Sequence, residues 1–107
     1  MSDTPDPHDI GPDRPRFDWN AEKAALNFAK HGVTFEEAAT VYDDPRRVEI
    51  YDVLHSFEED RFIWIGFSFR MRLLLVVVYE QEKDKVYRII SARRATRDEG
   101  LRYFSEA

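Results

Sequence analysis

Four arginines stand close together in the segment VYRIISARRATRDE, residues 86–99, of a chain whose formal net charge is −5. Arginine presents a planar fork of donors that binds phosphate oxygens in pairs, and it stays charged at any usable pH. The cluster therefore indicates a site for a ligand that carries phosphate. The alternative is a solvated sheet edge, where charged side chains guard against aggregation. The four residues are Arg88, Arg93, Arg94 and Arg97.

Regular strand alternation would divide these arginines between two faces. Arg88 and Arg94 would lie on one side of the strand, and Arg93 on the other. They could serve one site only if the strand ends or bulges near Ala92.

His55 is the first candidate for proton transfer, because an unperturbed pKa of about 6.5 suits a general acid or base. It lies in the loop LHSFEEDR with Glu59 and Arg61. The alternative is structural: His55 and Ser56 would form a turn, and a salt bridge between Glu59 and Arg61 would fix the hairpin.

His31, in the sequence KHG, is the second histidine of interest, although a cation near a helix C-terminus is stabilising by itself. The chain has no cysteine, and its three histidines are scattered. We therefore expect no zinc site, no other metal centre and no cofactor.

Charge is distributed unevenly along the chain. Residues 17–60 contain four Lys or Arg against eleven Asp or Glu, whereas residues 61–103 contain ten against five. A polyanion is the natural partner for the basic half. The N-terminal segment has no apolar stretch of signal-peptide length, and the longest apolar run, LLLVVVY, is too short for a bilayer, so we expect a cytoplasmic protein.

The elements that must position these residues begin with two helices. Asn20 can cap a helix from Ala21 to His31 that Gly32 ends, with Ala24, Leu26 or Phe28 as candidates for its apolar side. In the following segment, TFEEAATVYDDP, Thr34 and Glu37 have capping-box spacing and Pro45 ends the element.

A period of two then indicates four strands in VEIYDV, RFIWIGFS, LLLVVVYE and VYRIISA. Thr96 and Glu99 repeat the capping-box spacing and begin a last helix with Leu101 and Phe104 on its apolar side. The order ααββββα predicts an α+β domain over residues 17–107, with two N-terminal helices on a four-stranded antiparallel sheet. Residues 1–16, rich in proline and aspartate, are expected to form a flexible arm.

Aromatic and β-branched residues are assigned to the core because of the area they bury. They are Phe17, Trp19, Phe35, Phe62, Trp64 and the run from Leu73 to Tyr79. Asp43 and Asp44, before Pro45, are assigned to a helix end and turn.

Several of these segments together resemble the BrnT family of bacterial type II toxins. The matching stretches are FDWNAEKAALNFAKHGVTFEEAATVYDDP, HSFEEDRFIWIG and YRIISARRAT with RY behind it, within residues 17 to 103. The resemblance implies a RelE-like fold and a growth-arresting ribonuclease. It also implies neutralisation by the ribbon-helix-helix antitoxin BrnA, in a hetero-oligomeric complex that binds operator DNA through the antitoxin.

Metal-independent RNA cleavage needs proton-transfer groups for the 2′-hydroxyl and the leaving oxygen, and cations around the phosphorane. With the resemblance, the candidates for catalysis are His55, Glu59, Arg61, Arg88 and Arg93. Arg97 is left to the helix surface. The candidates for RNA binding are Lys23, Lys30, His31, Arg94 and Tyr103.

Two other functions use the same basic surface. The chain could be a non-catalytic nucleic-acid-binding module, or a degenerate toxin that acts as a co-repressor with its antitoxin. Toxins of this class usually have a basic RNA cleft that the antitoxin partly covers, so we expect the basic half to be the site of inhibition.

Overall fold

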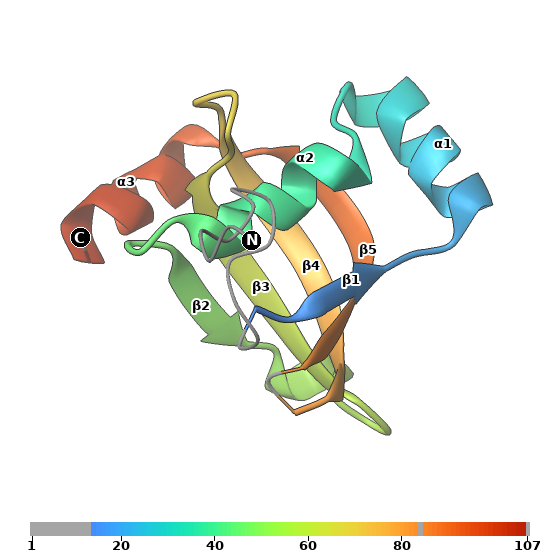
Figure 1. Cartoon of the computed structure of the whole chain (residues 1–107). Coiled ribbons are helices and arrows are strands. Elements are labelled where there is room, and N and C mark those ends of the chain that lie inside the picture. Colours follow the sequence, from blue (N-terminus) through green and yellow to red (C-terminus); the bar gives the residue numbers. More distant parts are fainter. Residues whose placement is uncertain (1–13, 84, 107) are drawn as a thin grey trace, which may run out of the picture.

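The computed structural model describes residues 14–83 and 85–106, which form one mixed sheet and its covering helices (Figure 1). The strand order is β1-β5-β4-β3-β2. The strands are β1 (Arg16–Asp18), β2 (Val48–Tyr51), β3 (Asp60–Phe67), β4 (Leu73–Glu82) and β5 (Val86–Arg94); the helices are α1 (Ala21–His31), α2 (Phe35–Ala39) and α3 (Arg97–Glu106), with 3-10 turns η1 (Thr40–Asp43) and η2 (Val53–His55).

The α+β class and the four predicted strands are confirmed, but the sheet has an additional strand. β1 pairs in parallel with β5, from Arg16 opposite Val86 to Asp18 opposite Arg88. The prediction of a purely antiparallel four-stranded sheet is therefore wrong. A three-residue strand is too short to show a period, and it exists only because β5 offers it backbone partners.

The N-terminal arm predicted over residues 1–16 lies outside the described residues up to residue 13. Of its last three residues, Arg14 forms an ion pair with Asp43, Pro15 is buried and Arg16 begins β1. No helix in the described part of the chain has the length and apolar character needed to cross a membrane.

α1 begins and ends where its capping residues predict. α2 begins at its predicted cap but ends at Ala39, well before Pro45, and the 3-10 turn η1 continues the chain to Asp43. The Asn20 side chain accepts a hydrogen bond from the Lys23 N–H, and Gly32 ends α1 with a φ of 69°. Leu26 and Phe28 are 70% and 53% exposed, however, so they do not form the packed side of α1. Asn27 does: it is buried, and its side chain bonds both the N–H and the C=O of Ala92 on β5.

α2 begins at the predicted cap, because the Thr34 hydroxyl accepts a hydrogen bond from the Glu37 N–H. The Glu37 carboxylate does not return to the cap. It is 2% exposed and binds the Arg72 guanidinium and the Ser68 hydroxyl instead. The hydrogen bonds from Arg72 hold the pKa of Glu37 below its ordinary value, so a buried ion pair replaces the second half of the predicted capping box.

The main core fills the space between the sheet and the N-terminal helices, and Figure 1 shows α2 lying across this face. Rings of Phe17, Tyr42, Trp64 and Tyr87 meet at centroid distances of 5.0 to 6.1 Å. Phe35, Trp64, Leu74, Val76 and Val78 are fully buried here, as assigned from the sequence.

A smaller cluster lies between α3 and the opposite face of the sheet. The predicted capping box at the start of α3 is confirmed, because Thr96 and Glu99 exchange hydrogen bonds. The predicted apolar side is wrong: Leu101 and Phe104 are 59% and 63% exposed, whereas Tyr103 is buried against Val48 and Ile65. The spacing of Leu101 and Phe104 predicted one face of α3 as its apolar side, but the sheet packs against the face that carries Tyr103.

Candidate active site

A bulge in β5 brings two of the predicted arginines to one face of the sheet. Val78 pairs with Ile89 and Val77 pairs with Ser91, which leaves Ile90 as the extra residue. The alternation therefore restarts, and Arg88, Ser91 and Arg93 share the face that regular spacing would have denied them. The sequence required a strand end or a bulge near Ala92 if Arg88 and Arg93 were to share one site, and the bulge at Ile90 meets that requirement.

Three side chains form a row across neighbouring strands on this face. Arg61 of β3 pairs with Tyr79 of β4, and Tyr79 pairs with Arg88 of β5. Directly opposed residues place their side chains side by side. The Arg61 guanidinium accordingly lies 5.9 Å from the centroid of the Tyr79 ring. Arg88 also faces Asp18 of β1, at 3.5 Å.

His55 lies beside this row with a carboxylate behind it. Its Nδ1 is 3.0 Å from both carboxylate oxygens of Asp52, the residue that directly precedes the 3-10 turn η2. An acidic partner at Nδ1 favours the tautomer with a proton on that atom and directs Nε2 to proton transfer. The hydrogen bond with His55 lowers the pKa of Asp52, so this carboxylate stays charged.

Asp52 also links His55 to the row of arginines. The Arg61 Nε lies 3.1 Å from Asp52 Oδ2, close enough for an ion pair, but this N–H has no aligned hydrogen-bond acceptor. The contact is therefore a charge contact; this Nε is buried, so only the terminal nitrogens of the guanidinium can meet a ligand. His55 itself is more than half exposed.

A cleft of about 410 Å³ opens at this position. It is lined by His55, Phe57, Glu58, Glu59 and Tyr79. The structure thus brings together His55 and Glu59, which the sequence singled out, and places Arg61 next to them through Asp52 and Tyr79. The predicted salt bridge between Glu59 and Arg61 does not form, because Asp52 takes that arginine instead.

Arg93 lies at the other end of β5, roughly 15 Å from Arg88 at 3.3 Å per residue with one bulge. Its two terminal nitrogens each donate a hydrogen bond of 2.8 Å to the Glu99 carboxylate. The same contact lowers the pKa of Glu99 to about 2. The fork that the sequence offered to phosphate is therefore occupied, and Arg93 attaches α3 to the sheet.

The three predicted RNA-binding residues of α1 do gather in one place. Lys23, Lys30 and His31 line a second cleft, of about 250 Å³, against Ile90 and Ser91 of the β5 bulge. Ser91 shares a sheet face with Arg88. Arg88 and the three α1 residues of this cleft thus form a cationic border along β5.

The remaining two RNA-binding candidates have different surroundings. Arg94 is exposed at the end of β5. Tyr103 is 4% exposed, and its hydroxyl donates a 2.7 Å hydrogen bond to Asp44. The ring is therefore unable to stack on a base, which corrects its placement among the RNA-binding residues. Burial, with this hydrogen bond second, raises the pKa of Tyr103 to about 12.

Two residues of the site were not identified from the sequence. Asp52 had a usable signal, because a carboxylate three residues before a histidine can reach it within a turn. Tyr79 was assigned to the core with the rest of its apolar run. The run LLLVVVY is apolar throughout, so it gives no sign of which of its side chains a helix covers and which stay accessible.

No group of three or more His, Asp or Glu side chains with the arrangement of a metal site occurs within residues 14–83 and 85–106.

The comparisons with known proteins agree with one another. The family model described as "Ribonuclease toxin, BrnT, of type II toxin-antitoxin system" matches residues 19–99. Among solved structures, the chain is similar to the Brucella abortus ribonuclease toxin BrnT, known from a crystal structure at 1.1 Å resolution. The two are 20% identical, with a TM-score of 0.58 over 78% of this chain and 99% of that one, which shows a shared fold. Among curated proteins, none matches the chain.

Proposed function

Because the chain belongs to the BrnT family of ribonuclease toxins of type II toxin–antitoxin systems, we propose that it cleaves RNA at the His55 cleft without a metal ion. In this reaction the 2′-oxygen attacks the adjacent phosphorus while the bond from phosphorus to the 5′-oxygen breaks. The products are a cyclic 2′,3′-phosphate and a 5′-hydroxyl. One proton leaves the 2′-hydroxyl, and one reaches the 5′-oxygen.

The observation that carries this proposal is the pairing of His55 with Asp52 beside the row of Arg61, Tyr79 and Arg88. Asp52 orients the imidazole, so Nε2 can take or give a proton. Arg61 and Arg88 place two permanent positive charges where the phosphorane gains negative charge. Glu59 lines the same cleft, and we assign the two proton transfers to His55 and Glu59 together.

We place the flanking RNA along the cationic border of β5. Beyond Arg88, this border continues to the cleft formed by Lys23, Lys30 and His31. These side chains are charged or polar and half-buried to exposed, so they can neutralise backbone phosphates without taking part in the chemistry. Exposed Arg94 extends the border. This part of the site contributes affinity, not rate.

Membership of a type II system implies an antitoxin partner. We propose a BrnA-type ribbon-helix-helix antitoxin, which forms a hetero-oligomer with this chain in the cytoplasm. The antitoxin covers the basic face and so excludes RNA, and the complex reaches operator DNA through the antitoxin alone.

The test is cleavage of a defined single-stranded RNA by the purified, antitoxin-free protein in the presence of EDTA. The wild type should produce cyclic-phosphate ends. His55→Ala should lower the turnover rate by a factor of roughly 100 or more, since general acid–base catalysis contributes about that much. Asp52→Asn should retain part of the activity, with a shifted pH–rate profile, because it changes only the orientation and charge behind the imidazole.

His31→Ala is the matched control, because it removes the same side chain from the neighbouring cleft. It should raise KM and leave kcat unchanged. Intact RNA with the wild type would overturn the catalytic proposal in favour of a non-catalytic module or a co-repressor. Cleavage that stops with EDTA and returns with Mg²⁺ would overturn metal independence alone.

A further inference from the structure

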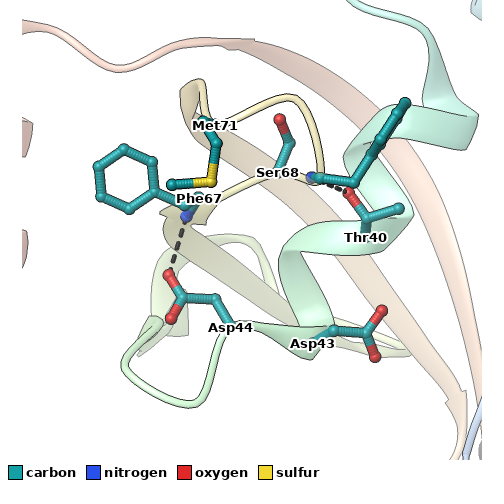
Figure 2. Close-up of a pocket in the computed structure, with 7 residues that line it drawn as sticks. Thr40, Asp43, Asp44, Phe67, Ser68 and Met71 are labelled. Carbon is teal, nitrogen blue, oxygen red and sulfur yellow. Dashed lines mark hydrogen bonds between the residues drawn. The ribbon is translucent and has the colours of Figure 1, made fainter.

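A pocket of about 660 Å³ lies at the opposite end of β3 from the His55 cleft. It is formed between η1 and the turn that joins β3 to β4 (Figure 2). From Arg61 to Phe67, β3 spans about 20 Å. Figure 1 accordingly shows this turn and the segment before β3 at opposite ends of the sheet. The pocket is lined by Thr40, Asp43, Asp44, Phe67, Ser68, Phe69 and Met71.

Hydrogen bonds from the turn to η1 fix the walls of this pocket. The Phe67 N–H donates to Asp44 and the Phe69 N–H donates to the Thr40 hydroxyl, each at 2.9 Å (Figure 2). Behind them, the Ser68 hydroxyl is bound to buried Glu37. A pocket held in this way is largely preformed, so a ligand loses little free energy in ordering it.

The rim is apolar and open to solvent. Phe69 and Met71 are 69% and 74% exposed, although both belong to a tight turn. Met71 has a φ of 59°, which is uncommon for a residue other than glycine, so the turn presents this side chain at some cost in backbone strain. The exposed ring of Phe104 on α3 lies 6.2 Å from that of Phe67 and extends the apolar surface.

The charges that line this pocket do not favour RNA as its occupant. Both ionisable residues that line the pocket, Asp43 and Asp44, are acidic; Arg14 pairs with Asp43, whereas Asp44 accepts its hydrogen bonds from neutral groups, so Asp44 is the charge left to a ligand. Burial works to raise the pKa of Asp44, but hydrogen bonds from the Phe67 N–H and the Tyr103 hydroxyl hold the pKa below its ordinary value. A negative charge therefore persists at the wall of an apolar pocket. Its complement is an apolar side chain next to a Lys or Arg.

We propose that this pocket is an anchor site for the antitoxin, separate from the basic face that the antitoxin shields. It takes one apolar side chain from an antitoxin segment, and a neighbouring basic residue of that segment faces Asp44. The inference rests on the antitoxin partner of the proposed function. A second copy of this chain fits less well, because contact between two such faces would bring the same acidic residues together.

The test compares Phe69→Glu with Leu101→Glu, since Leu101 is an exposed apolar residue on α3, outside both the pocket lining and the basic face. Both purified variants and the wild type are titrated with the purified BrnA-type antitoxin by calorimetry. Phe69→Glu should raise Kd at least tenfold, whereas Leu101→Glu should leave it within twofold. In the absence of antitoxin, RNA cleavage by Phe69→Glu should equal that of the wild type.

Met71→Glu is the second variant and should weaken antitoxin binding in the same direction, so that a folding defect in one variant does not decide the result. Equal Kd values for the wild type and both pocket variants would overturn the anchor site while the partner stands. A wild type that fails to bind the antitoxin would overturn the partner itself. A dimer that Phe69→Glu dissociates, with antitoxin affinity unchanged, would assign the pocket to a second copy and overturn the proposal.

Discussion

Arg88 and Arg93 lie on the same strand and the same face, but their surroundings differ. Arg93 gives both terminal nitrogens to Glu99 at 2.8 Å. Arg88 has one carboxylate contact, to Asp18, at the 3.5 Å limit of a hydrogen bond, and both partners are more than a third exposed. The same contrast separates Arg72, whose donors bind buried Glu37, from Arg61, which meets Asp52 through a buried Nε without an aligned hydrogen bond.

The number and geometry of the carboxylate contacts thus separate the arginines in the basic half of this chain that the fold uses from those that a ligand can reach. A guanidinium has five N–H donors, and a bidentate carboxylate uses the two that match a phosphate. Arg72 and Arg93 are therefore committed to the fold, whereas the looser contacts of Arg61 and Arg88 are consistent with the phosphate-binding role that we propose for them. Position in the sequence and net charge do not distinguish the two pairs.

The largest effect is expected when Arg88 and Arg93 are each truncated to alanine. Arg88→Ala should lower kcat/KM for RNA by a factor of roughly 100 to 1,000, which is typical of losing one group that stabilises transition-state charge, and should leave Tm nearly unchanged. Arg93→Ala should lower Tm and retain most of the activity of the folded protein. The measurements are single-turnover cleavage and thermal unfolding monitored by circular dichroism.

Loss of cleavage in Arg93→Ala, with Tm intact, would contradict the idea that an occupied fork marks a structural arginine. Arg97→Ala provides the background for both variants, because Arg97 is exposed on α3 and should change neither quantity.

The buried ion pair of Glu37 and Arg72, at the other end of the sheet, should contribute to the stability of the fold. Glu37→Gln removes the charge that Arg72 and Ser68 bind and should lower the free energy of unfolding by about 2 kcal/mol, since hydrogen bonds to charged groups contribute on that scale. Glu36→Gln changes the exposed neighbour and should stay within about 0.5 kcal/mol. Urea denaturation measures both values, and equal midpoints would show that Glu37 is not a structural ion.

Much of the fold could be predicted from local patterns. Asn20, Gly32, Thr34 and Thr96 fix helix ends through contacts with residues three or four positions away, and alternation fixes four strands. The missing pieces depend on distant partners. β1 exists because β5 has a free edge, and Glu37 leaves its cap because Arg72, 35 residues later, arrives beside it.

The site could be predicted only in part for the same reason. The residue type identified His55, Arg61 and Arg88, and the structure assembles these three around Asp52 and Tyr79. Residue type could not separate Arg88 from Arg93, because their difference lies in whether a carboxylate of another element meets them. Nor could it show that α3 turns Tyr103 inward towards Asp44.

The ion pair of Arg93 and Glu99 should make stability depend on pH. The hydrogen bonds from Arg93 lower the pKa of Glu99 from its ordinary value of 4.5 to about 2. A lowered pKa in the folded state stabilises the protein above pH 4.5, and this contribution is lost as the pH falls from 4.5 towards 2. Glu99→Gln should therefore reduce stability at pH 7 by about 1 kcal/mol, since the pair is partly exposed.

The difference between Glu99→Gln and the wild type should shrink as the pH falls through this window. Urea midpoints at pH 7, 5, 4 and 3 provide the check. A gap that stays constant over this range would mean that the substitution disturbs packing and that the charge of Glu99 contributes nothing.

The smallest expected effect concerns the cationic border, whose side chains should contribute affinity for RNA and nothing to catalysis. Lys23 lines the cleft beside the β5 bulge, so Lys23→Ala should remove about one phosphate contact. The slope of log K for single-stranded RNA against log salt should then fall by about 0.7, with kcat unchanged. Arg46→Ala, in the exposed loop before β2, should leave the slope as it is. If Lys23→Ala lowered kcat and left the slope intact, the second cleft would belong to the chemistry, and the division of the basic surface into a reacting row and a binding border would be wrong.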